Sequence, residues 1–428
     1  MFIDKLLMNS LGRKLIFTLS KYPRIYSKIR RIYRSTRRFT FTESINNLSF
    51  NPGPWQVKTE NPRLITIVTR DIPMYDRAGS YLRLHEIISI LQIMNLKVRI
   101  LSMNSIARQK SIWNLTGDGI NKYLNIYRDM GVEVLTDGIS ALNIIQSNVS
   151  DQKAYWIHEV SVAQDFIANF KGKVPFNHLI LDTVDLEFRR LLQLGDKSGY
   201  ESGLRLLRAV SNYVDDVVLI TQEEEEIFNK NIEEILNRTF VLSNIYPEFR
   251  PTNQDFKNSF EYDLLFVGNF LHHPNILAAS YIIDQLSPKL KGTQIALVGP
   301  NLPDEFTRRI ESRSECNISY LGQIEELSKV YESSRIVVAP LGVGAGIKGK
   351  VLEGLRHGKP VVGTTIAWEG IPRLNRNIQY EASLNDNFLE KIGEATQNPP
   401  ILTLEDCASL NSLFSRNQSL KILSEIFA

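Results

Sequence analysis

The chain has 428 residues, of which 43% are hydrophobic and 23% are charged, and its net charge is +3. This length allows two domains, and the composition is typical of a globular protein. The two cysteines give neither a metal-ligand spacing nor a disulfide framework, and no run of 18 uncharged apolar residues predicts a membrane-spanning helix.

The first forty residues are strongly basic. They hold eleven lysines and arginines against one acid, a net charge of +10, so the rest of the chain carries −7. Apolar residues such as Leu6, Leu11 and Ile25 are interleaved with these cations, as in a basic amphipathic helix. We predict that residues 1–60 form such a segment and a linker, and that it lies on an anionic membrane surface. Packing on the chain's own acidic domains is the alternative, whereas the absence of other nucleic-acid signals argues against nucleic acid as a partner.

Strands alternate with helices between residues 61 and 250. Such alternation predicts a parallel sheet with helices on both faces, because parallel strands need crossover connections. A helix is predicted at 81–94, where Leu82, His85, Ile88 and Leu91 recur at helical spacing. This range is the first predicted domain, and its apolar runs place strands at 64–70, 97–102, 132–137, 154–160, 178–185 and 215–221.

A second alternating series occupies residues 251–428. Its predicted strands are 263–269, 293–299, 317–323, 335–340, 360–365 and 378–383, and its predicted helices are 275–290, 303–313, 325–333 and 350–357. The chain is therefore predicted to be an α/β protein with two doubly wound Rossmann-like domains. Because such sheets bind ligands at the carboxyl ends of their strands, we expect a cleft between the facing loops of the two domains.

The most informative segment lies between Arg335 and Thr365. An apolar strand leads into a stretch of glycines and lysines, and then into a helix that ends before Gly358. Glycine lets the backbone approach a ligand, and a helix N-terminus with nearby cations favours an anion. The residues grouped in this stretch are Gly342, Gly344, Gly346, Gly349, Lys348 and Lys350. The pattern predicts an anion site, since a turn that needs glycines only for packing does not explain the lysines or Glu353.

The run PLGVGAGIKGKVLEGLRHGKPVVGTTIAWEGI, residues 340–371, resembles the nucleotide-sugar-binding segment of retaining glycosyltransferases of family 4, in particular their glycine-rich-loop subgroup. A dinucleotide-binding motif is disfavoured because this strand comes late and no acidic residue closes a following strand about twenty residues on. The resemblance extends less specifically over residues 62–400. It implies the GT-B fold, with the acceptor on the first domain and the donor on the second.

The resemblance also implies the residues of the donor site. The diphosphate is expected on the loop 344–350 and the ribose hydroxyls on Glu353, with Lys348 stabilising the leaving group. The complete set of implied donor-binding residues is Gly79, Ser80, Gly268, Asn269, Gly344, Ala345, Gly346, Ile347, Lys348, Lys350 and Glu353. No Asp-x-Asp motif is present, so we expect neither a metal nor a cofactor.

The chain departs from the family pattern at two places. Many family members carry a glutamate eight positions before the one that matches Glu353, and this chain has Ala345 there. Sugar contacts would then come from backbone amides of residues 345–347. An arginine and lysine pair after the first strand of the second domain is also missing, which leaves phosphate neutralisation to Lys348, Lys350 and the helix dipole.

Three residues of the first domain complete the expected site. His158 matches a family histidine that points at the donor sugar, which makes it a catalytic candidate; the alternative is a strand-end histidine bonded to neighbouring backbone. Asp182 and Asp185 either orient the acceptor or cap a helix. His357 is interpreted as a cation at the C-terminus of its helix.

These features predict a hexosyltransferase that moves a sugar from a nucleotide-sugar to a glycan or lipid-linked acceptor, with retention and without a metal. Two alternatives stay open. One is a non-catalytic, membrane-attached scaffold that binds a glycan or a nucleotide-sugar, and the other is a nucleotide-sugar epimerase or hydrolase of the same fold. The expected location is the cytoplasm, with peripheral attachment to the inner face of the membrane.

Overall fold

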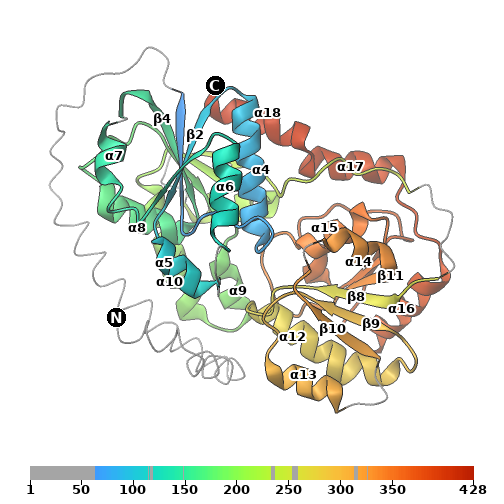
Figure 1. Cartoon of the computed structure of the whole chain (residues 1–428). Helices are drawn as coiled ribbons and strands as arrows, with labels where there is room; N and C mark the ends of the chain where they lie inside the picture. Colours follow the sequence, from blue (N-terminus) through green and yellow to red (C-terminus); the bar gives the residue numbers. More distant parts are fainter. Residues whose placement is uncertain are drawn as a thin grey trace. The chain divides into compact units, whose positions relative to one another are not determined.

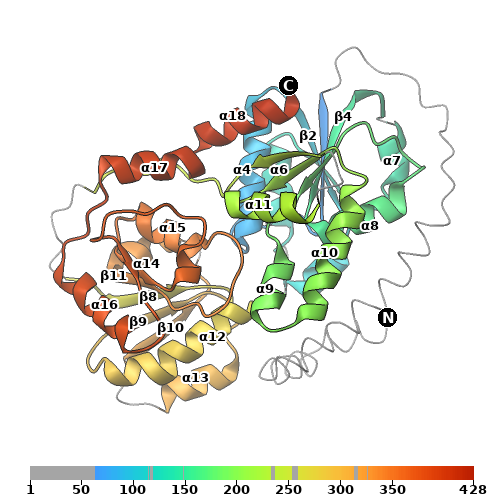
Figure 2. The ribbon, with the colours of Figure 1, turned by 180° about the vertical axis from the view of Figure 1, so that it is seen from behind.

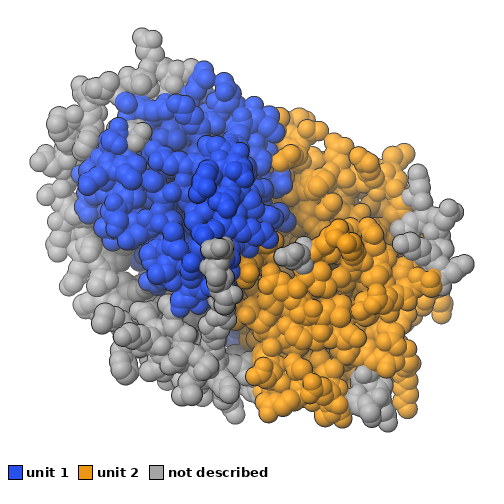
Figure 3. Space-filling model, viewed as in Figure 1, with its two compact units in different colours: residues 1–75, 80–242, 422–428 blue, residues 76–79, 243–421 orange. Residues whose placement is uncertain are grey.

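The computed structural model describes residues 63–428, apart from 114, 116–118, 148, 233–236, 253–258, 313–316 and 325. The predicted basic segment and linker, residues 1–60, lie outside the described residues. The chain forms two compact units (Figure 3). Unit 1 comprises residues 1–75, 80–242 and 422–428, and unit 2 comprises residues 76–79 and 243–421. None of the helices in the described part of the chain has the length and apolar character that a membrane span requires.

Unit 1 contains a seven-stranded parallel sheet with the strand order β3-β2-β1-β4-β5-β6-β7. Its central strands are apolar runs buried on both faces; all six residues of β1 are buried. The strands are β1 (Leu64–Thr69), β2 (Lys97–Ser102), β3 (Glu133–Thr136), β4 (Gln152–His158), β5 (Leu179–Asp182), β6 (Asp216–Leu219) and β7 (Arg238–Val241). The strand order reverses between β1 and β4, so ligand-binding groups are expected at the carboxyl ends of these two strands.

Helices cover both faces of this sheet: α4 and α6 lie on one side, and α7 and α8 lie on the other (Figures 1 and 2). Aromatic side chains fill much of the α8 side, where Phe166 stacks on Phe170 and contacts Tyr155 of β4. The helices are α4 (Gly79–Ile93), α5 (Ile106–Ile112), α6 (Asn121–Asp129), α7 (Leu142–Ser147), α8 (Val160–Phe170), α9 (Glu187–Gln193), α10 (Lys197–Ser211) and α11 (Gln222–Asn231), with a 3-10 turn at Val149–Asp151.

Unit 2 contains a six-stranded parallel sheet with the order β10-β9-β8-β11-β12-β13. Its strands are β8 (Tyr262–Val267), β9 (Ile295–Val298), β10 (Ile318–Gly322), β11 (Ser334–Ala339), β12 (Val361–Gly363) and β13 (Gln379–Glu381). The order reverses between β8 and β11. The loops after these two strands therefore start from neighbouring positions at one edge of the sheet.

The helices of unit 2 follow its strands in alternation, and three of them come after the last strand. They are α12 (His273–Tyr281), α13 (Asp304–Glu311), α14 (Leu327–Ser333), α15 (Gly349–Arg356), α16 (Asp386–Gln397), α17 (Leu404–Phe414) and α18 (Arg416–Phe427), with 3-10 turns η3 (Ser287–Lys289) and η4 (Thr365–Trp368). The helix predicted at 275–290 ends early as an α-helix and continues as a π-helical turn, η2 (Ile282–Leu286). Pro288 accounts for the change, because proline has no N–H and its ring crowds the preceding turn.

The sequence predicted the parallel α/β architecture correctly but missed several elements. It did not predict β7, a four-residue edge strand without a fully buried apolar run, and it did not locate α16, α17 or α18. The last seven residues belong to unit 1, whereas the prediction continued the second domain to residue 428. The reason is visible at the end of α18, where Leu423 and Ile426 are buried and the Ile426 carbonyl accepts from Arg238 at 3.4 Å.

Candidate functional site

The glycine-rich loop of unit 2 lies at the point where the strand order reverses. It leaves β11 and enters α15 at Gly349, and the neighbouring strand β8 ends at Val267, just before Gly268 and Asn269. Two segments of the predicted donor site, far apart in sequence, therefore start from adjacent strands. Lys348 is the N-cap residue of α15 and makes no side-chain hydrogen bond to the first turn, and the positive end of the helix dipole faces the loop.

Glycine is required where the backbones approach most closely. Gly346 has a φ of +68°, which side chains rarely tolerate. At Gly299, with a φ of +133°, an added Cβ would lie 2.0 Å from the carbonyl oxygen of Gly268. A Cβ at Gly268 would itself lie 2.7 Å from Cγ of Asn275. The loop after β8 is thus fixed by close packing on both sides.

Lys348 is held inside the loop rather than directed to solvent. Its Nζ donates to the carbonyl of Gly346 and lies 3.1 Å from Oε2 of Glu369. The two side chains of this ion pair are 10% and 11% exposed. The lysine that the sequence assigned to the diphosphate therefore lies within the loop and is paired with the carboxylate of Glu369.

Lys350 also points inward. Its Nζ donates to Oδ1 of Asn275 at 2.6 Å and lies 4.3 Å from the centre of the Phe266 ring. Burial, followed by the nearby Lys348 ammonium, lowers the pKa of Lys350 to about 7. Close to neutral pH this amine carries a proton only part of the time, and an anion that binds beside it will favour the charged form.

Glu353 lies one turn further along α15. Its carboxylate accepts from Nη1 of Arg356, with distances of 3.1 and 3.4 Å to the two oxygens. Burial raises its pKa, and Arg356 opposes this. His357 is the C-cap residue of α15, as expected, and its ring stacks on Tyr331 at 5.1 Å. Burial, then Arg356, lowers its pKa, which disfavours the cationic form that the sequence suggested.

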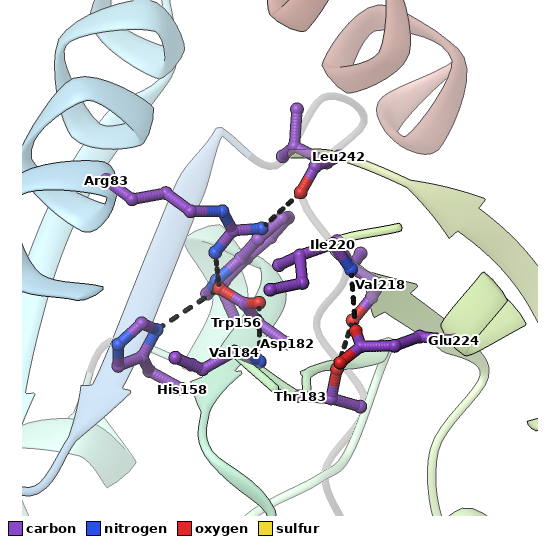
Figure 4. Close-up of polar contacts among 10 residues, drawn as sticks. All are labelled: Arg83, Trp156, His158, Asp182, Thr183, Val184, Val218, Ile220, Glu224 and Leu242. Atoms are coloured by element: carbon purple, nitrogen blue, oxygen red, sulfur yellow. Dashed lines mark hydrogen bonds and ion pairs between the residues drawn. The ribbon is translucent and has the colours of Figure 1, made fainter. Parts of the chain in front are cut away.

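A buried polar network in unit 1 centres on Asp182 at the end of β5 (Figure 4). Its Oδ2 accepts from Nη1 of Arg83 at 2.6 Å, Nε1 of Trp156 at 3.1 Å and Nδ1 of His158 at 3.1 Å, and its Oδ1 accepts from the Val184 amide at 3.3 Å. Burial alone would raise the pKa of Asp182, but the Arg83 guanidinium and His158 outweigh it and hold the pKa well below its usual range. The carboxylate is fully enclosed and ionised.

This network fixes the orientation of His158, which is fully buried at the end of β4. Because Asp182 is ionised, Nδ1 carries the proton and donates it to the carboxylate. In the neutral ring Nε2 then presents a lone pair, and it has no hydrogen-bond partner among the described residues. Bonding to a side-chain carboxylate replaces the backbone-bonded alternative, and Nε2 is left without a protein partner, as a substrate contact would require.

The helix-capping alternative for the two aspartates is wrong. The N-cap residue of α9 is Leu186, and no side chain caps that helix. Asp185 is half-buried and lies near Glu224, which accepts from the Leu186 amide at 3.1 Å. Glu224 also accepts from the Ile220 amide at 3.3 Å (Figure 4). Burial, then the charge of Asp185, raises the pKa of Glu224 to about 7.

Gly79 and Ser80 form the start of α4 after β1, and a Cβ at Gly79 would meet no atom within 4 Å. The sequence reasoning missed three residues that partner the predicted ones: Glu369, Asn275 and Arg83. Glu369 lies in the run that carried the family resemblance, so a signal for it existed. Among the described residues, no group of three or more His, Cys, Asp or Glu side chains has the arrangement of a metal site.

Comparison with known protein families identifies the segment that contains this loop. Residues 261–398 match the model of a family described as "Glycosyl transferases group 1". The matched residues include both loops at the reversal of strand order in unit 2. Comparison of the whole sequence with curated proteins gives no match.

Several solved structures have a fold similar to that of this chain. Sucrose-phosphate synthase from Thermosynechococcus elongatus is 12% identical, with a TM-score of 0.62 over 85% of this chain and 98% of that one. Anabaena HepE in complex with UDP-glucose is 14% identical, with a TM-score of 0.59 over 85% and 99%. A glycosyltransferase from Rickettsia africae is 14% identical, with a TM-score of 0.54 over 86% and 98%. The chain thus has the GT-B fold of two Rossmann-like domains, as the sequence predicted.

Proposed function

We propose that the protein transfers a hexosyl group from a nucleotide-sugar donor to a hydroxyl of a glycan or lipid-linked acceptor, as a retaining glycosyltransferase of family 4. One observation carries the proposal. Lys348 and Lys350 both reach the loops at the reversal of strand order in unit 2, at the N-terminus of α15 and inside the segment that matches group 1 glycosyltransferases. Two ammonium groups and a helix N-terminus suit a diphosphate.

The positions of the residues around the glycine-rich loop support the following roles. We assign the diphosphate to residues 344–350 and to Lys348, whose ammonium would stabilise the charge that develops as the diphosphate leaves. Lys350 supplies the second positive charge beside Gly268 and Asn269. Glu353 is assigned to the ribose hydroxyls. The fold shared with Anabaena HepE in complex with UDP-glucose supports a nucleotide-sugar as the donor class.

The proposed transfer needs only the donor and the acceptor as reactants. The bond between the anomeric carbon of the sugar and the β-phosphate oxygen breaks, and a bond from that carbon to the acceptor oxygen forms. The proton of the acceptor hydroxyl leaves with the diphosphate. Fixed amides, two ammonium groups and a helix dipole supply charge stabilisation at the leaving group, and for this reason we propose a metal-independent reaction.

Unit 1 supplies the second half of the proposal. Nε2 of His158 is a buried acceptor, so we assign it to a hydroxyl of the bound substrate. Asp182 acts through His158 as a positioning residue, because its carboxylate is already filled by four donors. Asp185 is the aspartate that we assign to the acceptor side. Attachment to the inner face of the membrane through residues 1–60 is proposed from their charge alone.

The test compares Lys348→Ala with Lys329→Ala, which removes an exposed lysine of the same unit. Binding of uridine, guanosine and adenosine diphosphates is measured by calorimetry, and sugar transfer is measured with the matching nucleotide-sugars. Lys348→Ala should weaken diphosphate binding and lower turnover, whereas Lys329→Ala should match wild type. Wild-type protein that binds a nucleotide-sugar without turnover would indicate the scaffold. A modified nucleotide-sugar in the absence of acceptor would indicate the epimerase or hydrolase.

A further inference from the structure

The carboxylate of Glu369 belongs to the glycine-rich loop in space although it lies 21 residues beyond Lys348 in sequence. Its Oε2 is 3.1 Å from Nζ of Lys348, and the side chain is only 11% exposed. The loop itself, residues 341–349, contains no acidic residue. Glu369 therefore brings negative charge to a loop that otherwise presents amides and an ammonium group.

The turn before Glu369 is fixed against this loop. Oγ1 of Thr364 donates to the carbonyl of Leu341 at 2.7 Å, and the same side chain caps η4 by accepting from the Ala367 amide. A Cβ at Gly344 would lie 3.3 Å from Cγ2 of Ile366 and 3.0 Å from Cε of Lys348. Glu369 is thus held beside the loop by neighbouring contacts as well as by its own ion pair.

A nucleotide-sugar would change the partners of this carboxylate. A diphosphate that contacts Lys348 competes with Glu369 for the same ammonium, and the two anions repel each other at such a short distance. An ionised carboxylate can only accept hydrogen bonds. The hydroxyl groups of a sugar attached to that diphosphate are donors in the immediate neighbourhood.

We propose that Glu369 binds hydroxyl groups of the transferred sugar and thereby selects the sugar that the enzyme uses. This inference rests on the proposed function and assigns a residue to the sugar half of the donor. Glu369 is the counterion of Lys348 in the free protein, and it exchanges that ammonium for sugar hydroxyls when the diphosphate arrives. It provides the carboxylate that position 345, an alanine, does not supply.

A sugar contact and a simple counterion differ in a measurable way. A free nucleoside diphosphate carries more negative charge than its nucleotide-sugar, so the reference ligand is the methyl ester of the diphosphate, which has the same charge as the nucleotide-sugar. If Glu369 were only the counterion of Lys348, its removal would strengthen binding of the methyl ester and of the nucleotide-sugar by the same factor. If Glu369 contacts the sugar, its removal weakens binding of the nucleotide-sugar relative to the methyl ester. The ratio of the two dissociation constants therefore separates the two roles.

The experiment measures both dissociation constants by calorimetry for wild type, Glu369→Gln and Glu381→Gln. The pairs are the methyl ester of UDP with UDP-glucose, the methyl ester of GDP with GDP-mannose, and the methyl ester of ADP with ADP-glucose. Glu381→Gln is the matched control, because Glu381 is an exposed carboxylate that accepts from Thr365 of η4. The melting temperature of each free variant checks that the fold is intact, and Glu369→Asp tests whether a shorter carboxylate retains part of the effect.

For the pair that wild type binds, Glu369→Gln should lower the preference for the nucleotide-sugar over the methyl ester by roughly tenfold, the effect of one charge-assisted hydrogen bond. Glu381→Gln should leave that preference unchanged. An unchanged ratio in folded Glu369→Gln overturns the assignment of Glu369 and leaves the proposed function standing. If wild type binds none of the six ligands, the proposed function fails, and the assignment of Glu369 fails with it.

Discussion

Nζ of Lys350 donates to Oδ1 of Asn275 at 2.6 Å, which connects the first turn of α15 to the first turn of α12. Nδ2 of Asn275 continues the chain of hydrogen bonds to the carbonyl of Asn269 at 2.8 Å. The same ammonium lies over Phe266 of β8. Lys350 thereby joins the two segments of the proposed donor site, and its charge is placed where apolar surroundings make it costly in the free protein.

The position of Lys350 predicts that diphosphate binding is linked to proton uptake. Its pKa is about 7 in the free protein, so at about pH 8 it is mostly neutral, and a bound diphosphate will favour the ammonium form. We expect uptake of up to about one proton per diphosphate from this residue. Calorimetric titration in two buffers with different ionisation enthalpies measures the uptake. Lys350→Met, which keeps an apolar chain on Phe266, should lose this contribution, and equal uptake by both proteins would contradict the prediction.

Glu353 is predicted to recognise the ribose. Glu353→Gln keeps the shape of the side chain but replaces a charge-assisted hydrogen bond with a neutral one, which should weaken nucleoside diphosphate binding by about 1–2 kcal/mol. The same substitution should weaken binding of a 2′-deoxyribonucleoside diphosphate by a smaller amount. Exposed Glu332 on α14 gives the control variant, Glu332→Gln. If Glu353→Gln weakens binding of the ribose and deoxyribose compounds equally, Glu353 acts only as the partner of Arg356.

The ion pair of Arg83 and Asp182 should be essential for the stability of unit 1. Both side chains are almost completely buried, at 1% and 0% exposure. Asp182→Asn leaves the guanidinium without a negative partner and should reduce the free energy of unfolding by about 3–5 kcal/mol. Arg70 and Asp165 provide the control, because their pair has the same 2.6 Å distance but is 23% and 38% exposed. Asp165→Asn should reduce the free energy of unfolding by about 1 kcal/mol or less. Equal reductions for the two variants in urea unfolding would show that burial does not decide how much each ion pair contributes to stability.

The position of the glycine-rich loop between β11 and α15 was predictable because its signals are local in sequence. Glycines, lysines and the start of a helix all fall between residues 342 and 353, and the structure keeps them together. The partners of the predicted site residues in both units come from elsewhere in the chain: Asn275 is 75 residues from Lys350, and Arg83 is 99 residues from Asp182. Helical spacing does not show whether Lys350 lies on the surface of α15, and only the packing against Phe266 shows that it points inward. Such pairs of side chains depend on tertiary structure, which the spacing of apolar residues along the sequence does not predict.

The N-terminal segment is predicted to attach the protein to acidic lipid. Each surface cation contributes roughly 1 kcal/mol near such a membrane, and salt screens this attraction. Full-length protein should float with vesicles that contain anionic lipid, and the bound fraction should fall steeply as salt rises. A variant without residues 1–40 should remain unbound while it still acts on a small soluble acceptor. Equal flotation of both proteins would contradict the prediction.

Glu224 predicts a specific dependence of stability on pH. Its side chain is fully buried, and its pKa is raised from 4.5 to about 7 by burial first and by Asp185 second. Between these two pH values the folded protein retains a proton that the unfolded chain has lost, so the free energy of unfolding falls as the pH rises from about 4.5 to 7. The contribution of this group is about 3 kcal/mol over that window.

Glu224→Gln isolates this effect because glutamine cannot ionise in this range. Urea unfolding of both proteins at several pH values should show that wild type loses more stability than the variant as the pH rises to 7, with the two curves running parallel above it. Glu223→Gln is the control: Glu223 is the neighbouring residue, its side chain is 53% exposed, and it pairs with Arg189. Curves that run parallel throughout would mean that Glu224 is already ionised at pH 4.5, held in that state by the Leu186 and Ile220 amides.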